Sequence, residues 1–599
     1  MSFLTALFQV DWKSAASIFQ QDGVLEAIMD SVDLAPSEHL ARTVAQLLSQ
    51  AIGHKPCRGG LSPQAIKWLD FTSQNSSNAN TRITATNALI KLSKGSAFDN
   101  AQTLGDAVGD VQTRVGSRND EDLAASMKAV IVAGANETSL ADAVEGLAYL
   151  SVDPMMKEEL SQDTVFLKRL FSLVPRRKTN NASGSIDTPT TLAFGVLSIA
   201  SNLCTYRPRL TEEQIQMEKL RNMASAPKAN TKSSSPSILD DDDHVRARIR
   251  RAIDVGVLDI FSLVIRSDTV AVRALTAKAL LSIVEEKDNR GKVLQSGGAK
   301  VLMHIIKQSM PFYQQSLSSA SPQALETTTL DAIQALAKLA ITSSPIQVFG
   351  PNEGAMYDAI RPFSLMLQGS SSTLLQRFES MMALTNLSSQ GTETATRIAK
   401  SDGLLQKVEL LLLEDHTLVR RAAMELICNL IAGSDEVFER YGGEDNPSAT
   451  KSKLQIMFAL SDVDDLPTRL AASGAVATLT SAPSACAAII SLQSDKHRVF
   501  SILAQLIDPS VIDRDNSEEE KESIDLEVHP GLVHRAIIST RNIFSGVSDK
   551  VLLEQLIREA EEAGLQHALM NLVKTQGGRV DAGVLRPAVE ALQVLMDKS

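Results

Sequence analysis

The chain has 599 residues, enough for about four ordinary globular domains or for one solenoid of about a dozen repeats. Its net charge of -12 argues against a general nucleic-acid-binding protein, because neutralising phosphates requires an excess of Lys and Arg. Aromatic residues make up only 4% of the chain, which suits stacked Leu- and Ala-rich helices better than β-sandwiches.

The N-terminal stretch MSFLTALFQVDWK has an Asp at position 11 and no cation ahead of its apolar residues, so we expect no signal peptide. No uninterrupted apolar run approaches the roughly 18 residues that cross a bilayer. Four cysteines lie far apart and form no CxxC pair, as expected of buried thiols in a reducing compartment. They are Cys57, Cys204, Cys428 and Cys486. The sequence therefore predicts a cytoplasmic protein.

Short helices are predicted along nearly the whole chain, because apolar residues recur at three- and four-residue spacing without strand alternation. A helix-closing pattern, a small residue followed by Leu-x-x-Leu or a close variant, recurs at residues 87–92, 147–150, 199–203, 335–339, 383–387, 474–479 and 591–595. Leu387 and Leu430 are 43 residues apart, and Leu430 and Leu479 are 49 apart. Periods in the forties are typical of armadillo and HEAT units. We predict an all-α, elongated armadillo/HEAT-like helical-repeat solenoid, a superhelix with a concave groove.

The repeats are looser at the start of the chain, so we predict two parts. These are armadillo-like repeats at 1–185 and a second array at 186–599. Two polar stretches interrupt the second array, a Ser-, Lys- and Pro-rich one at 206–243 and an acidic one at 508–530. Their polarity predicts disordered or exposed loops. The aspartate run 240–243 lacks the turn glycine and alternating ligands of an EF-hand loop, so we interpret it as acidic linker.

Four arginines follow that run, namely Arg246, Arg248, Arg250 and Arg251. Apolar residues lie between them, which predicts an amphipathic helix. Aspartates before this helix and arginines along it suit the helix dipole. We interpret the arginines as a solvated face and not as a nucleic-acid site.

Two stretches 147 residues apart, 255–284 and 402–431, share one template. Each opens with a glycine before an apolar helix, and sixteen residues later comes a Val-Arg pair, at 272–273 and 419–420. A second apolar run then closes each stretch. A repeated unit of this kind cannot bury its apolar face alone and must stack on copies of itself. The template predicts a binding scaffold and no enzyme.

Asparagines recur near the end of the closing helix, at Asn202, Asn386, Asn429 and Asn542, and Ser282 takes the equivalent place. Asparagine is a mediocre helix former, so its recurrence needs a reason. In an armadillo stack the third helices line the groove, where carboxamides can bond the backbone of an extended peptide. The alternative is that these side chains brace neighbouring turns inside the stack.

Sequence motifs for catalysis are absent. There is no phosphate-binding loop, dinucleotide-binding fingerprint or nucleophile elbow. The histidines show no metal-ligand spacing, and the nearest pair, His529 and His534, is interpreted as a turn followed by a helix start. We predict no catalytic residue, no metal and no cofactor.

Residues 377–489 contain RFESMMALTNLSS, LVRRAAMELICNLIAGSDEVFERY and TRLAASGAVATLTSAPSACAAI. These lines resemble the UCS (Unc/Cro/She) family of myosin chaperones, and the resemblance extends more weakly over about 185–599. Members of that family are armadillo solenoids whose UCS domain binds the myosin motor domain and assists its folding, stability and engagement with actin. The resemblance implies a myosin-binding co-chaperone that acts through an armadillo groove and supports the actin cytoskeleton and cytokinesis.

The resemblance also implies which residues form the groove. They would be Asn386 and Asn429, with Arg420, Glu425, Phe438 and Tyr441 nearby. Animal-type members begin with a tetratricopeptide domain that docks a heat-shock chaperone. This chain lacks the W-x2-L-G-x2-Y pattern, so it resembles the shorter fungal type, and a heat-shock chaperone is left as a partner by another route.

An alternative function stays open, a generic armadillo-repeat scaffold or adaptor for another extended peptide. Import adaptors pair each groove asparagine with a tryptophan, and here the tryptophans are Trp12 and Trp68, outside the asparagine-bearing region. Self-association of an open-ended stack also stays open. Nucleic acid and membrane are not expected as partners.

Overall fold

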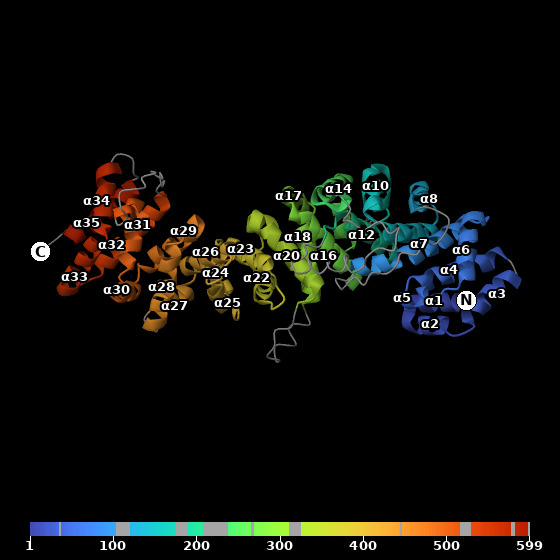
Figure 1. Cartoon of the computed structure of the whole chain (residues 1–599), viewed down its shortest axis with the longest axis horizontal. Coiled ribbons are helices and arrows are strands. Elements are labelled where there is room, and N and C mark those ends of the chain that lie inside the picture. The colour runs from blue at the N-terminus through green and yellow to red at the C-terminus, as the bar shows by residue number, and fades with distance from the viewer. Residues whose placement is uncertain are drawn as a thin grey trace, which may run out of the picture. The chain divides into compact units, whose positions relative to one another are not determined.

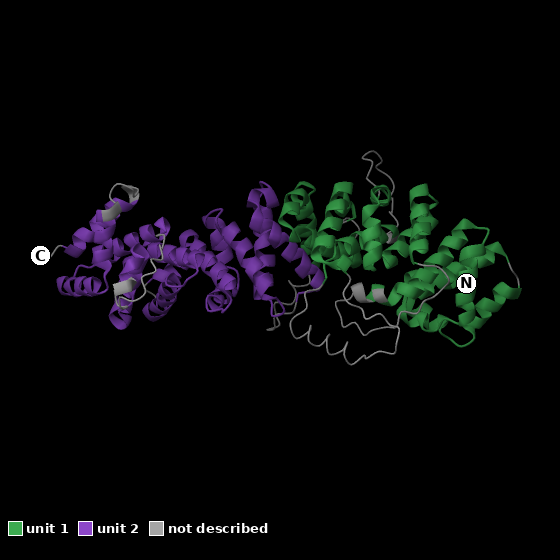
Figure 2. Cartoon of the chain, turned by 45° about the horizontal axis from the view of Figure 1, so that its top comes forward, with its two compact units in different colours: residues 1–311 green, residues 312–599 purple. Residues whose placement is uncertain are grey.

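The computed structural model describes residues 1–34, 37–102, 120–174, 190–207, 238–264, 269–310, 325–443, 446–514, 529–576 and 582–596. Within these ranges the secondary structure is helical and no strand occurs, which confirms the predicted all-α class. The chain forms two compact units, residues 1–311 and 312–599 (Figure 2). The predicted boundary at residue 185 stays a prediction, since that residue lies outside the described ranges.

Unit 1 is a succession of short and medium-length helices (Figure 1). They are α1 (Ser2–Val10), α2 (Trp12–Phe19), α3 (Val24–Leu34), α4 (Glu38–Ile52), α5 (Lys55–Arg58), α6 (Pro63–Asn75), α7 (Ala79–Gln102), α8 (Asp120–Ala133), α9 (Glu137–Leu150), α10 (Pro154–Gln162), α11 (Thr164–Ser172), α12 (Thr190–Cys204), the 3-10 helix η1 (Ile238–Asp240), α14 (Asp242–Val255), α15 (Val257–Val264), α16 (Val270–Glu285), α17 (Lys287–Gln295) and α18 (Gly298–Ser309).

Unit 2 repeats a three-helix module. After α20 (Thr327–Thr342) come α21 (Pro345–Phe349), α22 (Glu353–Gln368) and α23 (Leu374–Ser388); α24 (Thr392–Ala399), α25 (Leu404–Leu411) and α26 (Thr417–Gly433); α27 (Asp435–Gly442), α28 (Pro447–Ser461) and α29 (Leu466–Leu479); α30 (Pro483–Lys496), α31 (Val499–Ile507), η2 (Pro509–Arg514) and α32 (Pro530–Ser545); and α33 (Lys550–Glu562), α34 (Leu565–Gln576) and α35 (Ala582–Met596). This three-helix module is the one expected of armadillo repeats.

The repeated template corresponds to a short helix followed by a long helix. Residues 255–284 form α15 and α16, and residues 402–431 form α25 and α26. The opening glycines Gly256 and Gly403 have φ of +104° and +68°, a left-handed backbone that favours glycine. The closing apolar runs are buried in the core. The predicted template is confirmed.

The third helix of each module packs against the third helix of the next, which puts the closing patterns into one row per unit. In unit 2 the row is α20, α23, α26, α29, α32 and α35, and in unit 1 it is α4, α7, α9, α12 and α16. Leu387, Leu430 and Leu479, the last leucines of three successive patterns, are almost completely buried between these helices. The row exists because each apolar stripe is covered only by its neighbours.

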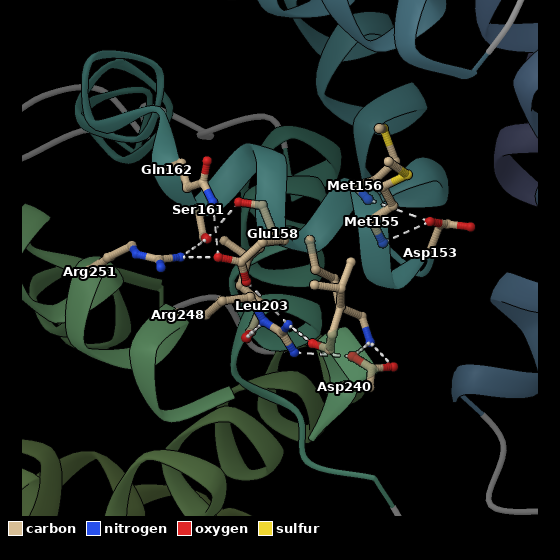
Figure 3. Close-up of polar contacts among 12 residues, drawn as sticks. Asp153, Met155, Met156, Glu158, Ser161, Gln162, Leu203, Asp240, Arg248 and Arg251 are labelled. Carbon is tan, nitrogen blue, oxygen red and sulfur yellow. Dashed lines mark hydrogen bonds and ion pairs between the residues drawn. The ribbon is translucent and has the colours of Figure 1, made fainter. Parts of the chain in front are cut away.

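The end of the polar stretch at 206–243 differs from the prediction. Residues 208–237 lie outside the described ranges, but Asp240 closes η1, and the next aspartates begin α14. Asp240 accepts hydrogen bonds from Arg248 Nη2 at 3.1 Å and from Lys157 Nζ at 3.2 Å (Figure 3). The end of this stretch is therefore structured and is not a linker.

Arg248 is likewise not part of a solvated face, because none of its surface is exposed. Its Nε donates to the carbonyl of Leu203, on α12, at 3.2 Å. Its neighbour Arg251 donates to Glu158 Oε1 at 2.6 Å and to Ser161 (Figure 3). Arg248 and Arg251 fix α14 on α10 and α12, and a charge pattern alone did not reveal these partners, whereas Arg250 is exposed as predicted.

The acidic stretch at 508–530 is described only at its ends. Residues 509–514 form η2, and residues 515–528 lie outside the described ranges. His529 is the N-cap of α32, and its Nδ1 accepts a hydrogen bond from the Gly531 amide at 3.2 Å. This geometry confirms the predicted turn and helix start at HPGLVH.

Candidate partner-binding face

The recurring asparagines reach from one third helix to the one before it. Asn429 on α26 donates through Nδ2 to the carbonyl of Thr385 at 3.2 Å and to Ser388 Oγ at 3.3 Å, both on α23. That hydroxyl itself donates to the Thr385 carbonyl at 2.7 Å. The carboxamide and the hydroxyl together satisfy a carbonyl in the last turn of a helix, where such groups lack intrahelical partners.

The same contact recurs at other repeats. Asn202 donates to Ser151 Oγ at 2.9 Å, and Asn542 donates to Thr480 Oγ1 at 3.2 Å. Asn386 on α23 faces α20, where Ala340 stands in the place of the hydroxyl residue. Asn386 donates instead to the Ala340 carbonyl, at 2.6 Å. We call these contacts the asparagine ladder.

The ladder uses the donor half of each carboxamide inside the stack, as the bracing alternative predicts. Among the described residues, the Oδ1 acceptors of Asn386 and Asn429 have no hydrogen-bond partner, whereas Oδ1 of Asn542 accepts from Arg541 at 3.0 Å. Ser282 donates to the Lys278 carbonyl of its own helix at 3.0 Å. A role in binding an extended peptide stays a prediction and would use the free acceptors.

The arginine of the Val-Arg pair also has a structural partner. Arg420 Nη1 donates to the Glu414 carbonyl, at 3.1 Å, in the turn before α26. At the equivalent places, Arg377 donates to Gly369 and Arg469 to Ser461, each at 3.3 Å. These arginines, the arginine ladder, bond carbonyls at the end of the preceding helix. Arg420 therefore points to the preceding turn and does not join the face formed by the row.

Two aromatic residues predicted near the groove lie on α27, outside the row of third helices. Tyr441 is only 1% exposed, and its hydroxyl donates to Glu409 Oε1 at 3.0 Å. Burial, with the nearby Glu409 carboxylate, raises the pKa of Tyr441. Phe438 is half-buried on the same short helix. The structure does not bring either residue to the asparagines.

The third helices of unit 2 do present one partly exposed side to solvent. On α26 the accessible residues follow helical spacing and therefore share one face: they are Leu418, Arg421, Glu425, Asn429 and Ala432. The register-equivalent residues are accessible on α23 (Leu375, Phe378, Met382, Asn386, Ser389), on α29 (Pro467, Leu470, Gly474, Thr478, Ser481) and on α32 (Gly531, His534, Ile538, Asn542, Ser545). We call this set the open stripe.

The chemistry of the open stripe changes along the row. Phe378 and Met382 make it apolar on α23, and Ile538 does so on α32. On α26 it carries two charged residues, Arg421 and Glu425, which are not bonded to each other. The stripe is thus a surface for a partner that has both apolar and polar side chains.

Arg421 is held by an ion pair. It donates through Nε to Asp465 Oδ2 at 2.9 Å, with a second contact through Nη2, and Asp465 is the N-cap of α29. The arginine lowers the pKa of Asp465 to about 2. Glu425, by contrast, has no hydrogen-bond partner among the described residues, and burial raises its pKa. It is the acidic group on the stripe that lacks a bonded cation.

Gly474 leaves the middle of the stripe without a side chain. A Cβ built there would lie 3.4 Å from Cys428 Sγ and 3.4 Å from Arg535 Cζ. The same guanidinium donates through Nη1 to the Leu470 carbonyl, which fixes α32 on α29. A larger residue at 474 would therefore displace its neighbours or fill the stripe.

The first third helix of unit 2, α20, does not extend the open stripe. The equivalent side chains there, Gln334 and Lys338, are buried, and both donate to Glu379 on α23, at 2.9 Å and 2.5 Å. This buried network adds to the Asn386–Ala340 contact at the junction of α20 and α23. The open stripe therefore begins at α23.

Sequence reasoning found four members of the open stripe that it assigned to the groove, namely Asn386, Glu425, Asn429 and Asn542. It missed Phe378, Met382, Arg421, Gly474 and Ile538. The available signal was the register, because these residues lie four or eight positions before the asparagine position. Arg421 was missed in favour of its neighbour Arg420.

Within the described ranges, no group of three or more His, Cys, Asp and Glu side chains is arranged to hold a metal ion. No single described helix is long and apolar enough to cross a membrane, and the one pair that passes on length and composition together, Leu466–Leu479 with Pro483–Lys496, is bent by 119°. The four cysteines are free thiols.

The chain is similar to known proteins along most of its length. A family model described as "UNC45-central: Myosin-binding striated muscle assembly central" matches residues 1–127. Protein unc-45 homolog B of Xenopus tropicalis is 30% identical over 347 residues, which cover 57% of this chain and 33% of that protein. Ring assembly protein 3 of Schizosaccharomyces pombe is 27% identical over 366 residues, or 60% of this chain and 44% of that protein.

The fold has known counterparts as well. The structure of UNC-45 from Drosophila melanogaster matches with a TM-score of 0.71 at 24% identity, covering 99% of this chain and 65% of that one. This likeness concerns the fold. The chain spans about a third of the length of the vertebrate relative and less than half of the Schizosaccharomyces one.

Proposed function

We propose that this chain, a relative of the UCS proteins, is a myosin-binding co-chaperone that holds the motor domain of a myosin through the open stripe. One observation carries the proposal: sequence similarity to UNC-45 proteins covers more than half of the chain, and a family model described as myosin-binding matches its start. The open stripe supports it, because four successive repeats offer one continuous set of accessible side chains.

The proposed mechanism is holding without chemistry. Apolar residues of the stripe, Phe378, Met382 and Ile538, cover apolar surface of a partly folded client that would otherwise aggregate. The free Oδ1 atoms of Asn386 and Asn429 accept hydrogen bonds from client N–H groups. Contacts spread over four repeats combine individually weak terms into a usable affinity. No nucleotide hydrolysis is part of this mechanism, and we expect none from the purified chain.

The cellular setting follows from the same proposal. A co-chaperone of myosin acts in the cytoplasm, where actomyosin assembles during processes such as cytokinesis. We propose that a heat-shock chaperone works on the same client, reached by a route other than a tetratricopeptide domain. The free thiols of the chain suit a reducing compartment.

The test is binding of the full chain to a purified myosin motor domain, followed by suppression of the motor's heat aggregation. The double variant Phe378→Ser with Met382→Ser removes the apolar part of the stripe on α23. We expect it to bind at least about tenfold more weakly, which corresponds to about 1.4 kcal/mol. The matched control is Val551→Ser on α33, a 75% exposed apolar residue outside the stripe, which should bind as the wild type.

Two outcomes count against the proposal in different ways. If the folded double variant binds as tightly as the wild type, the stripe is not the client surface. If the folded wild-type chain binds no motor domain, the co-chaperone proposal fails. The generic armadillo scaffold, whose partner would be another extended peptide, is then the remaining function.

A further inference from the structure

Exposed leucines gather where the third helices of unit 2 begin. Leu374 and Leu375 open α23, Leu418 lies in the first turn of α26, and Leu466 opens α29. Leu413, in the turn before α26, is 66% exposed. We call these five residues the leucine edge. The core between these helices is filled by other side chains, among them Leu387, Leu430 and Leu479 near the C-terminal ends of the same helices. The leucines of the first turns are left partly exposed.

The three helices run parallel, so their first turns lie on one side of unit 2. Asn429 near the end of α26 bonds Thr385 near the end of α23, so the C-terminal ends of these two helices are adjacent. Arg421 near the start of α26 bonds Asp465 at the start of α29, so the N-terminal ends are adjacent as well. The leucine edge is therefore one surface built from three repeats.

Acidic side chains without an ion pair accompany these leucines. Glu414 and Asp415 precede α26 and Asp464 precedes α29, and none forms a salt bridge within the described residues. Asp465 next to them is already neutralised by Arg421. The guanidinium of Arg420, bonded to the Glu414 carbonyl, keeps its charge and lies beside Glu414, whereas the carboxylates of Asp415 and Asp464 are exposed. The leucine edge is thus apolar with an acidic border.

The spacing of the repeats sets the shape of a matching partner. Packed helices lie about 8–10 Å apart, so leucines of successive repeats recur at about that interval. A helix rises 1.5 Å per residue, so about five to seven of its residues span one interval. A helix lying across α23, α26 and α29 would meet the edge with apolar residues at about i, i+7 and i+14. A segment of about 18 residues suffices.

We propose that the leucine edge docks an amphipathic helix of a partner protein that carries leucine-like residues on one face and Lys or Arg beside them. The apolar face of that helix covers Leu375, Leu418 and Leu466, and its cations lie against Asp415 and Asp464. Three repeats act together, because no single leucine offers enough area to hold a helix. This inference does not depend on the identity of the client.

The experiment measures binding of a fluorescent 18-residue Leu/Lys amphipathic peptide to the full chain by anisotropy. We expect the double variant Leu375→Ser with Leu418→Ser to bind at least about tenfold more weakly. Asp415→Asn with Asp464→Asn should weaken binding severalfold at low salt and reduce its salt dependence, because screening acts on exposed charges. Ile346→Ser on α21, which removes an apolar residue that is 65% exposed and lies outside the leucine edge, is the control and should not change binding.

Two control peptides make the result decisive. A Leu/Glu peptide of the same pattern should bind at least about tenfold more weakly, and so should a scrambled Leu/Lys peptide that cannot form an amphipathic helix. Equal binding of the scrambled peptide would mean attraction by net charge alone and would overturn the proposal. So would wild-type affinity in the folded leucine double variant.

The motor-domain assay separates this inference from the co-chaperone proposal. Leu375 and Leu418 belong to both the open stripe and the leucine edge, so loss of peptide binding with unchanged motor binding in the leucine double variant would show that motor binding does not need these two residues, and both proposals would stand. A failure of the wild-type chain to bind the motor domain would remove the co-chaperone proposal, and the peptide result would still decide the leucine edge by itself.

Discussion

At the scale of single residues, the asparagines that recur along the chain are explained by their neighbours. Asn202, Asn429 and Asn542 each donate to a Ser or Thr hydroxyl two places beyond the asparagine position of the previous third helix. A carboxamide is suited to this contact because it can donate within the stack and still offer an acceptor outside it. The residue is kept in a helix despite its modest propensity because it satisfies the end of another helix.

Asn429→Ala should lower the free energy of unfolding by about 1–2 kcal/mol, because the Thr385 carbonyl and the Ser388 hydroxyl lose a donor. Denaturant unfolding followed by helical circular dichroism measures the change. A double-mutant cycle with Ser388→Ala should give a coupling energy, since the two side chains bond each other. If Asn429→Ala has the stability of the wild type, the asparagine does not brace the stack, and binding a partner would be its remaining role.

The Arg421–Asp465 pair predicts a pH dependence at the same scale. The folded-state pKa of Asp465 is about 2 and its ordinary value is 3.8, so the folded state keeps the carboxylate ionised to lower pH than the unfolded state does. The pair therefore adds stability above about pH 4 and loses it as the pH falls from about 4 to about 2. Part of this stability comes from the hydrogen bonds of Thr468 to the same carboxylate, which also lower its pKa.

Asp465→Asn is the variant that tests this, since asparagine can still cap α29. The stability difference between wild type and variant should be full at pH 6 and should shrink toward pH 2. Asp464→Asn, which removes a carboxylate with no ion pair, should give a small difference that does not follow this course. A constant difference for Asp465→Asn across this range would contradict the assigned ion pair.

At the scale of helices, the contacts between third helices set the register of the stack. Arginines bond the end of the helix before them within a module, and asparagines bond the third helix of the module before. On α20, the first helix of the row in unit 2, Lys338 occupies the asparagine position. Its partner is a buried carboxylate on the next third helix, Glu379 of α23. A buried ion pair of this kind costs desolvation and is strongly destabilising when only one partner is removed.

Glu379→Ala should therefore destabilise unit 2 by about 3 kcal/mol, because the buried Lys338 ammonium would lose the carboxylate that it contacts at 2.5 Å. The double variant Lys338→Met with Glu379→Leu should recover most of that loss, leaving only the Gln334 amide without its acceptor. Thermal unfolding of both variants provides the comparison. A double variant no more stable than the single one would show that the pair contributes more than mutual neutralisation.

At the scale of the whole molecule, the repeat pattern was enough to predict the helical class and the helices of both template stretches, because the apolar period is local. The choice between Arg420 and Arg421 was not predictable, since adjacent residues on a helix differ by about 100° and a small error in phase selects the wrong one. Burial of Arg248 was not predictable either, because its acceptor at Leu203 lies 45 residues away. Local periodicity predicts where helices form. The hydrogen-bond partners of their side chains are set by how the helices pack.

The two ladders have a consequence for how proteins of this kind can diverge. The asparagines and arginines that make the repeats recognisable serve the stack, so they are constrained whatever the client is. Met382, Glu425, Gly474 and Ile538 serve no such contact and share one register position on four successive helices. Duplicated copies of this chain can therefore acquire different clients through substitutions at these four positions, while the asparagines and arginines of the two ladders stay the same.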